Sequence, residues 1–264
     1  MSAPSRSKEA SGLRILAFES SAKAASVAIL QDGALLGEYF QNSGQTHSRT
    51  LTKMAEDLLA NCDLTVADVD AVAVAAGPGS FTGVRIGVAA AKGFAWAREL
   101  PCCGVSTLEA MVYAAAMCDG IYCACMDARR EQVYNAVFSV EDGKPARLSD
   151  DRAISIEALG ASLKKLEKPV FLVGDGAQLC YNTLRVSILS LRLLPEHLCF
   201  QRAAGVALAA QTKLVAGQTC SGLELVPNYL RLSQAEQSRL NSTQHITALS
   251  PQYSKTVKTQ GAPH

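Results

Sequence analysis

The sequence has almost no net charge, because its 25 basic and 24 acidic residues leave a formal charge of only +1. No overall electric field therefore draws the chain toward nucleic acid or an anionic membrane, and any contact with RNA would be local or supplied by a partner. Long apolar runs are missing as well. The run from Ile15 to Phe18 is too short for the core of a signal peptide, and no stretch reaches the length of a membrane span. We therefore expect a soluble protein in the cytoplasm.

Cysteine is present, but without the spacings that define a metal site or a disulfide scaffold. The nine cysteines are odd in number, no Cys-x-x-Cys pair occurs, and the four histidines lie far apart along the chain. Several cysteines sit inside apolar runs such as Ile121 to Met126, where a thiol behaves as a small hydrophobic side chain. We expect no disulfide framework, no bound metal and a reducing environment.

The apolar content of 48% over 264 residues is enough for a substantial core, in one large domain or in two small lobes. The two ends of the chain differ from the rest. Residues 1–12 are small and polar, and residues 240–264 are rich in Ser, Thr and Gln with little apolar periodicity. We predict that both ends are disordered tails.

The hydrophobic pattern predicts two successive units with the same order of elements: three strands, a helix, a strand and a helix. In the first unit we expect strands at 13–18, 26–30 and 34–40, helix 47–62, strand 71–75 and helix 82–98, followed by strand 102–106 and helix 107–118. In the second unit we expect strands at 121–127, 132–140 and 145–149, helix 155–167, strand 170–173, and helices 177–189 and 201–216. The repeat predicts an α/β fold with two similar lobes, residues 13–118 and 119–239.

Acidic residues and glycine-rich turns occupy matching places in the two units. Glu19 and Asp127 end the first strand of each unit, and Gly77-Pro78-Gly79 and Gly174-Asp175-Gly176 follow the fourth strand. Carboxylates and tight backbone that face each other across two lobes are typical of the nucleotide cleft of actin-like and Hsp70-like ATPases. We therefore predict this ribonuclease H-like fold, with a cleft lined by Glu19, Ser20, Gly77, Gly79, Ser80, Thr82, Arg85, Asp127, Gly174, Asp175 and Gly176.

The segment from Gly77 to Gly87 carries the densest signal. A strand that ends in Gly-Pro-Gly and leads into a helix capped by Ser80 or Thr82 leaves backbone N–H groups free, which suits an anion. The same residues also fit a plain tight turn, and the segment is not a P-loop because no Gly-Lys-Ser or Gly-Lys-Thr ending follows. Arg85, one turn into the helix, would either clamp the anion or lie in solvent.

Small residues recur every four positions along helix 82–98 in two rows, Gly83, Gly87, Ala91, Ala95 and Ala89, Gly93, Ala97. Glycine inside a helix costs about 1 kcal/mol relative to alanine, so the rows need a reason. They let another backbone approach closely, and that backbone belongs either to the same domain or to a partner. The partner interpretation predicts an interface of His47, Leu51, Met54, Leu58, Gly83, Gly87 and Ala91. We interpret His47 as a local hydrogen-bonding residue and not as a catalytic one.

Seven stretches, taken in order, resemble the TsaB (YeaZ) family: Ile15–Ser21, Ser26–Ala28, His47-Ser48, Gly77–Gly87, Gly104–Glu109, Asp127–Arg130 with Val133-Tyr134, and Pro227–Arg231. The resemblance covers about residues 13–232. Its Gly-Pro-Gly-Ser-Phe-Thr-Gly stretch is highly specific for the family.

The resemblance implies an actin-like protein that takes part in adding a threonylcarbamoyl group to an adenosine of tRNA. In the family, TsaB pairs with its paralogue TsaD, which carries the chemistry, and acts with the ATPase TsaE. For this chain the resemblance implies a heterodimer with TsaD, a ternary complex that includes TsaE, a homodimer when alone, and contact with tRNA only through the complex.

The resemblance also implies that the chain has no catalytic residues of its own. TsaD binds its metal through two histidines four residues apart, at places that here hold Ser106 and Ala110. Neither side chain ligates a metal as imidazole does. Glu19 stands where the family usually has Asp, and this longer carboxylate would crowd a phosphate. We therefore expect that the chain requires no cofactor. We also predict that ATP or ADP binds in the cleft only weakly, if it binds there.

Two other functions remain open from the sequence. A stand-alone ATP-binding or ATP-hydrolysing actin-like enzyme would hold phosphates with Gly77–Gly83 and Gly174–Gly176. A glycoprotease-like metallopeptidase is disfavoured, because the sequence has neither a histidine pair for a metal nor a nucleophile beside a base.

Overall fold

The computed structural model of the chain describes residues 12–231, so the predicted tails, apart from Gly12, lie outside the described residues. All contacts given below belong to the compact unit that ends at Leu230.

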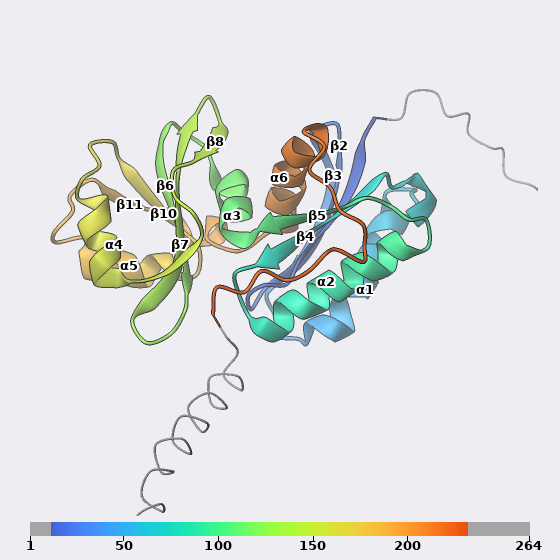
Figure 1. Cartoon of the computed structure of the whole chain (residues 1–264), viewed down its shortest axis with the longest axis horizontal. Helices are drawn as coiled ribbons and strands as arrows, with labels where there is room; N and C mark the ends of the chain where they lie inside the picture. Colours follow the sequence, from blue (N-terminus) through green and yellow to red (C-terminus); the bar gives the residue numbers. More distant parts are fainter. Residues whose placement is uncertain (1–11, 232–264) are drawn as a thin grey trace, which may run out of the picture. The chain divides into compact units, whose positions relative to one another are not determined.

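The first lobe is built on a five-stranded sheet with the strand order β3-β2-β1-β4-β5 (Figure 1). Its strands are β1 (Arg14–Glu19), β2 (Ala25–Gln31), β3 (Ala34–Gln41), β4 (Ala71–Gly77) and β5 (Cys102–Ser106). The first three strands form an antiparallel meander, whereas β4 and β5 run parallel to β1. Strands β1, β2 and β4 are almost continuously apolar and buried, as expected where helices cover both faces of a sheet.

The second lobe repeats this plan. Its sheet has the order β11-β10-β6-β7-β8, and β9 pairs with β7 beside β8. The strands are β6 (Gly120–Asp127), β7 (Gln132–Glu141), β8 (Lys144–Arg147), β9 (Arg152–Ser155), β10 (Val170–Val173) and β11 (Leu191–Leu193). Read from its third strand, β8-β7-β6-β10-β11 has the same order as the first sheet. The predicted duplication and the α/β fold are therefore confirmed, and β9 and β11 are two short strands that the sequence patterns missed.

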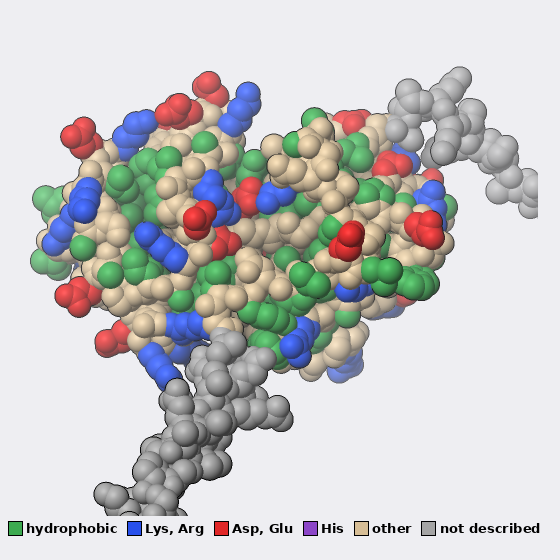
Figure 2. Space-filling model, viewed as in Figure 1, with side chains coloured by type: hydrophobic (Ala, Val, Ile, Leu, Met, Phe, Trp, Pro, Cys, Tyr) green, Lys and Arg blue, Asp and Glu red, His purple; other side chains and the backbone are tan. Residues whose placement is uncertain are grey.

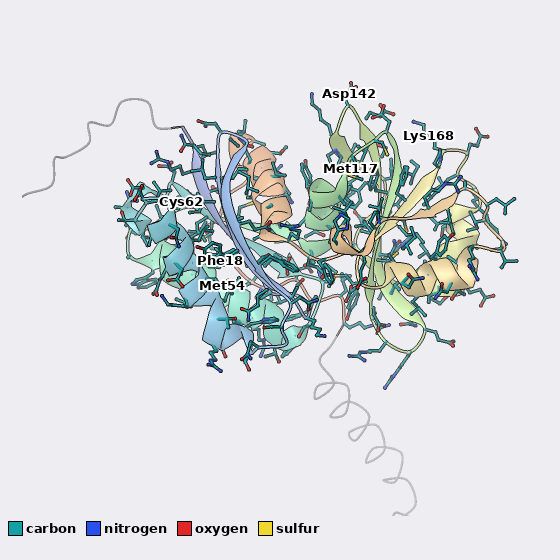
Figure 3. All side chains as sticks on the ribbon, turned by 180° about the vertical axis from the view of Figure 1, so that it is seen from behind. Phe18, Met54, Cys62, Met117, Asp142 and Lys168 are labelled. Carbon is teal, nitrogen blue, oxygen red and sulfur yellow. The ribbon has the colours of Figure 1, made fainter. Side chains whose placement is uncertain are left out.

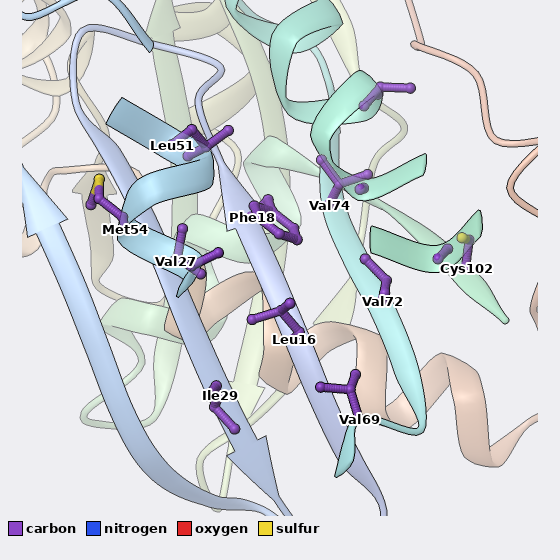
Figure 4. Packing of buried hydrophobic residues seen from close by; sticks show 14 of the residues in the cluster. Leu16, Phe18, Val27, Ile29, Leu51, Met54, Val69, Val72, Val74 and Cys102 are labelled. Atoms are coloured by element: carbon purple, nitrogen blue, oxygen red, sulfur yellow. The ribbon is translucent and has the colours of Figure 1, made fainter. Parts of the chain in front are cut away.

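Helices cover both faces of the first sheet. The helices α1 (His47–Asn61) and α2 (Phe81–Trp96) pack over Leu16 and Phe18, whose side chains point to one face of β1 (Figure 4). Helix α6 (Ala203–Val215) packs over Ile15 and Ala17 on the opposite face. Successive residues of a strand point to opposite faces, so one apolar strand contributes to two separate cores.

The second sheet is covered in the same way. Helices α4 (Ile156–Leu163) and α5 (Ala177–Leu184) pack on one face. Helix α3 (Thr107–Ala115) packs on the other with Leu108 and Met111, and it also contacts α6, so α3 and α6 lie together between the sheets (Figure 1). Two short 3₁₀ helices, η1 (Val66–Asp68) and η2 (Glu196–Leu198), complete the elements.

Helix α6 falls within the segment 119–239 that we predicted as the second lobe, yet it packs on the first sheet. Its contact with α3 is close, because a Cβ atom on Gly205 would lie 2.1 Å from the Ala110 carbonyl oxygen. Most of its residues are alanine or another small or apolar type, so its sequence pattern does not indicate which sheet it covers. The chain therefore returns to the first lobe after completing the second sheet.

The residues after α6 continue along the first lobe, and we call residues 216–230 the C-terminal arm. Leu225 of the arm is buried in the same core as Phe18 and Met54. Figure 3, which views the molecule from the side opposite to Figure 1, labels these last two residues. The Asn228 N–H donates to the Ala76 carbonyl oxygen at 2.6 Å, which ties the arm to the end of β4. Within residues 12–231, none of the helices has both the length and the apolar character that crossing a membrane requires.

Candidate functional site

The turn that follows β1 lies at the same edge of the first sheet as the glycine-rich segment that follows β4, because β1 and β4 are parallel neighbours. Two hydrogen bonds join them. The Ser80 N–H donates to the Ser21 carbonyl oxygen at 2.6 Å, and Ser20 Oγ donates to the Gly83 carbonyl oxygen at 2.9 Å. Ser80 is the N-cap of α2, since its Oγ accepts a hydrogen bond from the Gly83 N–H at 3.3 Å. The start of α2 is thus held against the chain's own turn.

The glycines of this segment are explained by close backbone approach. A Cβ atom on Gly79 would lie 2.4 Å from the Ser21 carbonyl oxygen, and one on Gly83 would lie 2.1 Å from the Ser20 carbonyl oxygen. On Gly87 it would lie 2.5 Å from Ser20 Oγ. Because the first two contacts are with backbone atoms, only glycine fits at positions 79 and 83, whereas a Cβ atom at position 87 would displace the Ser20 hydroxyl. The structure favours the plain tight turn, and phosphate binding by the segment stays a prediction.

The row of α2 that we predicted to contact a partner faces the interior of its own lobe. Gly83, Gly87 and Ala91 are buried, and Ala91 belongs to the core formed with α1. The prediction of a partner interface at these residues is wrong, because the backbone that approaches them is that of the turn at Ser20 and Ser21. Close packing within the domain, the other interpretation of the row, is the one that the structure supports.

The α1 residues assigned to the same interface are also wrong as contact residues. Leu51, Met54 and Leu58 are 9% exposed or less and form the core between α1 and the sheet. Figure 4 shows Leu51 and Met54 in this core. Their helical spacing reflects burial within the lobe. His47, at the start of α1, is half-buried, and its Nε2 lies 2.8 Å from the Ala22 carbonyl oxygen, in line with the local hydrogen bond that we expected.

The second row of small residues on α2 is the exposed one. Ala89, Gly93 and Ala97 all lie at the surface, and a Cβ atom on Gly93 would meet no atom within 4 Å. Trp96, the single tryptophan of the chain, is 70% exposed beside this row. The outer face of α2 between Ala89 and Ala97 therefore carries small exposed residues and one large apolar side chain.

Glu19 ends β1 in a fully buried position. Its Oε1 accepts a hydrogen bond from the Ser21 N–H at 2.6 Å, whereas its Oε2 has no hydrogen-bond partner among the described residues. Burial raises the pKa of the Glu19 carboxyl from 4.5 to about 7, and the negative charge of Asp175 adds to this rise. Near neutral pH this carboxyl is therefore partly protonated.

Asp175, in the glycine-rich turn after β10, is the carboxylate that faces Glu19 from the second lobe. Burial raises its pKa, and the charge of Asp127 contributes in the same direction. The Gln201 Nε2 group donates to Asp175 Oδ1 at 3.0 Å and counteracts part of this effect. Sequence analysis matched Glu19 with Asp127 as the two carboxylates of the cleft. In the structure, the charge of Asp175 acts on Glu19, and the charge of Asp127 acts on Asp175. Asp127 itself is exposed.

The glycines around Asp175 and the turn after Asp127 are tightly constrained. Gly174 has a φ of +108°, and a Cβ atom there would lie 2.2 Å from the Cys125 carbonyl oxygen. Asp127 Oδ1 accepts a hydrogen bond from the Arg129 N–H at 2.7 Å. Three successive residues of this turn, Arg129 to Glu131, have φ of +64°, +54° and +58°. Each such residue costs about 1–2 kcal/mol, so the turn is strained.

Arg85 does not reach into the predicted cleft. Its guanidinium lies 3.7 Å over the ring of Phe81, and its Nε donates to the hydroxyl of Tyr229 in the C-terminal arm at 2.7 Å. Tyr229 stacks in turn on Phe81 with 4.7 Å between the ring centroids. Arg85 is exposed on α2, as one of its two predicted roles requires, and its contacts are with Phe81 and Tyr229; its role as an anion clamp stays a prediction. Thr82 is exposed on the same turn of α2.

A polar pocket of about 240 Å³ opens at the ends of β4 and β5. Its wall includes Ser106 at the end of β5 and Glu109 of α3, together with Arg147 of β8 and Lys213 of α6. Glu109 forms ion pairs with Lys213 at 3.1 Å and with Arg147 at 3.4 Å. Figure 2 shows acidic and basic side chains gathered in the hollow at the centre of this face.

Sequence analysis missed Arg147 and Lys213. Each is a single basic residue outside any motif, and only the packing of α3, α6 and β8 brings them together. Ser106, which sequence analysis named as standing in place of a metal-binding histidine of TsaD, caps α3 by accepting a hydrogen bond from the Glu109 N–H at 3.3 Å. Across residues 12–231, the His, Cys, Asp and Glu side chains form no group of three that could hold a metal ion.

The repeated strand order and the two facing lobes define a protein of the actin-like ATPase fold. The crystal structure of YeaZ from Pseudomonas aeruginosa superposes with a TM-score of 0.66 at 24% identity, over 83% of this chain and 100% of that one. A second crystal structure, of a Pseudomonas aeruginosa protein with similarity to the peptidase YeaZ, has a TM-score of 0.70 at 24% identity and the same coverage.

Curated sequences extend the similarity beyond the fold. The tRNA threonylcarbamoyladenosine biosynthesis protein TsaB of Bacillus subtilis is 30% identical over 230 residues, which are 87% of this chain and 99% of that protein. TsaB of Escherichia coli is 38% identical over 132 residues, 49% of this chain and 57% of that protein. The family model of TsaD, the tRNA N6-adenosine threonylcarbamoyltransferase, matches residues 40–255. The chain belongs to the TsaB (YeaZ) family, which is related to TsaD.

Proposed function

We propose that this chain is a non-catalytic subunit of the machinery that forms N6-threonylcarbamoyladenosine in tRNA, and that it supports a TsaD subunit together with the ATPase TsaE. The observation that carries the proposal is the similarity to TsaB of Bacillus subtilis, which spans 99% of that protein. Because the similarity covers both lobes, the role proposed for the chain is that of a whole TsaB-type subunit and not of one shared domain.

The surroundings of Ser106 and Ala110 support a non-catalytic role. Ser106 Oγ serves as the cap of α3, and Ala110 is 1% exposed under α6. Because a Cβ atom on Gly205 would already lie 2.1 Å from the Ala110 carbonyl oxygen, α3 and α6 are too close for an imidazole at position 110. Metal ligation of the TsaD type would therefore require these two helices to separate.

The closed turn at Ser20 and Ser21 supports the same role. The N–H group of Ser80 already donates to the Ser21 carbonyl oxygen, and that of Gly83 donates to Ser80 Oγ. Two of the donors that a phosphate would use at the start of α2 are thus satisfied within the lobe. Glu19, buried beneath this turn, adds a carboxyl that would oppose a phosphate whenever it is ionised.

For the partner surface we propose the outer face of α2, formed by Ala89, Gly93, Trp96 and Ala97. The small residues allow a helix of a partner to approach closely, and Trp96 offers a large apolar anchor. The same face serves a second copy of the chain when TsaD is absent. Placing a long charged side chain on this face would block both associations without touching the core.

The test is a reconstituted reaction that contains TsaD, TsaE, tRNA and threonylcarbamoyl adenylate, with modified adenosine measured by mass spectrometry of nucleosides. We expect its formation to be lost when this chain is omitted and to be strongly reduced by Ala89→Arg. The matched control is Ala161→Arg, an exposed alanine of α4 on the second lobe, which should leave the reaction unchanged. An undiminished reaction without the chain would refute the required role.

A measurement on the isolated chain distinguishes the proposed role from the alternative, a stand-alone ATP-dependent enzyme. Calorimetry with ATP and magnesium, followed by an assay for released phosphate, should give weak binding at most and no hydrolysis. Tight binding with turnover would favour the enzyme and would overturn the non-catalytic role.

A further inference from the structure

Two cysteines lie directly opposite each other where the C-terminal arm meets the first sheet. Cys102 begins β5, the edge strand of that sheet, and Cys220 of the arm pairs with it in an isolated antiparallel bridge. The Cys102 N–H donates to the Cys220 carbonyl oxygen at 2.8 Å, and the Cys220 N–H donates to the Cys102 carbonyl oxygen at 2.9 Å. Both residues carry free thiols.

The Cα separation expected for such a pair falls within the range that a disulfide spans. Opposite residues of a hydrogen-bonded antiparallel pair have Cα atoms about 5.5 Å apart and side chains on the same face of the sheet. Disulfides join Cα atoms about 4.4–6.8 Å apart. The Cβ atoms of such a pair must approach by about 1 Å, and the arm can supply this shift because a single bridge joins it to β5.

The two thiols lie on the side where the arm covers β5, and the Cys102 thiol is 3.7 Å from the Leu100 carbonyl oxygen. Cys220 Sγ lies 3.6 Å from the Cys102 carbonyl oxygen. Cys102 Sγ lies under the arm, 4.0 Å from the place of a Cβ atom on Gly222. The neighbouring Cys103 points to the opposite face of the sheet, into the core beneath α6. Of these two adjacent cysteines, only Cys102 therefore faces Cys220.

The two cysteines differ in their access to solvent. Cys220 is half-buried, whereas Cys102 is fully buried. Burial raises the pKa of both thiols, to about 11 for Cys102. Oxidation should therefore begin at Cys220 and proceed faster as the pH rises, because the thiolate is the attacking species.

We propose that Cys102 and Cys220 are a redox modification site, at which a small-molecule disulfide such as glutathione disulfide converts the two thiols into an intramolecular disulfide. The Cys220 thiolate attacks one sulfur of the oxidant, forms a mixed disulfide and releases one glutathione thiolate. The Cys102 thiolate then attacks the Cys220 sulfur, closes the protein disulfide and releases the second glutathione thiolate. The two thiol protons end on the two glutathione molecules, so two protein thiols are oxidised and one glutathione disulfide is reduced.

The bond would fix the arm to the edge strand by a covalent link. In the reduced chain, the arm near Cys220 is held by this bridge and by a hydrogen bond from Lys92 Nζ to the Leu223 carbonyl oxygen at 3.3 Å. Further along the arm, Tyr229 contacts Arg85 at the start of α2. Oxidation would therefore lock a segment that borders the outer face of α2, and this inference does not depend on the proposed function.

The experiment treats the native full-length chain with glutathione disulfide at mildly alkaline pH, blocks remaining thiols with an alkylating agent, and maps linked peptides by mass spectrometry. We expect the loss of two of the nine thiols and a link between the peptides of Cys102 and Cys220. Amide hydrogen exchange should slow at Gly222 and Leu225 in the oxidised chain. A reducing agent should reverse both changes.

Four variants make the test specific. Cys220→Ser and Cys102→Ser should each abolish the link, whereas Cys103→Ser, at the adjacent buried position, should preserve it. Cys118→Ser, which removes the exposed cysteine, should also preserve it. Persistent mixed disulfide at Cys220 without closure, a link to Cys103, or a link only between two chains would each overturn the proposal.

Discussion

Helix α2 carries small residues on two of its faces, and the two faces have different surroundings. On the inner face, Gly83 and Gly87 touch the turn at Ser20 and Ser21 so closely that a Cβ atom would not fit. On the outer face, Gly93 meets nothing within 4 Å. The two rows look alike in the sequence, since both repeat every four residues. Their spacing shows that a backbone can approach, but not which backbone does so.

The largest effect is expected for Gly83→Ala on the inner face. The added Cβ atom would lie 2.1 Å from the Ser20 carbonyl oxygen, and a backbone atom cannot move aside as a flexible side chain can. We expect the free energy of unfolding to fall by about 3 kcal/mol or more, although alanine favours the helix. Urea unfolding followed by far-ultraviolet circular dichroism measures this. A loss below about 1 kcal/mol would contradict the assigned packing.

The second effect concerns Glu19, in the turn that receives the inner row. Its pKa is raised from 4.5 to about 7, so the folded state binds the proton more tightly than the unfolded state does. The stabilisation of the folded state by the proton on Glu19 is complete below about pH 4.5 and is lost as the pH rises through about 7. The loss is roughly 3 kcal/mol at most, because one pKa unit corresponds to about 1.4 kcal/mol.

Replacing this carboxyl by an amide tests the same point. Glu19→Gln should flatten the dependence of the free energy of unfolding on pH between about 4.5 and 7, with Asp175 leaving a smaller slope of the same sign. Unfolding curves at several pH values compare the variant with the unaltered chain. The exposed Glu56→Gln on α1 is the control and should leave the slope as it is. An unchanged slope in Glu19→Gln would show that Glu19 is not the titrating group.

A smaller loss is expected where the C-terminal arm covers the first turn of α2. Tyr229→Ala removes the ring stacked on Phe81 and the hydroxyl that accepts from Arg85. We expect a loss of about 1–2 kcal/mol in the free energy of unfolding, since the site is partly exposed. Tyr229→Phe keeps the stacked ring and should lose about 1 kcal/mol or less. Equal losses in both variants would assign the whole effect to the hydroxyl.

The smallest expected effect is a gain in stability on the outer face of α2, opposite in sign to the loss expected on the inner face. Gly93→Ala on the outer face adds a Cβ atom to open space and removes a glycine from a helix interior. The chain should gain about 0.5–1 kcal/mol in the free energy of unfolding. Thermal and urea unfolding should agree on this gain. A clear loss of stability would mean that the outer row also packs against part of the same chain.

The sequence was sufficient for the duplicated fold because each unit has strong apolar strands and amphipathic helices. The missed strands show where this fails: β9 has the sequence Arg-Ala-Ile-Ser and β11 has Leu-Arg-Leu, which are too short for a period to be recognised. Helix α6 was found, but not the sheet that it covers, because it is small and apolar on nearly all sides.

The candidate site was predictable in part for a similar reason. The turns that hold Glu19 and Asp175 followed from the ends of the predicted strands. The stacking of Arg85 on Phe81 and Tyr229 could not be predicted, because Tyr229 lies far along the chain and comes near only through the arm. The pocket residues Arg147 and Lys213 meet through three elements whose packing no local pattern encodes.

The position of α6 has a consequence for synthesis of the protein. Nearly the whole second lobe is translated between β5 and α6, and until α6 emerges from the ribosome the face of the first sheet that carries Ile15 and Ala17 has no helix α6 over it. The first lobe therefore cannot complete its core during its own translation, and the nascent chain presents an apolar surface of the kind that chaperones bind.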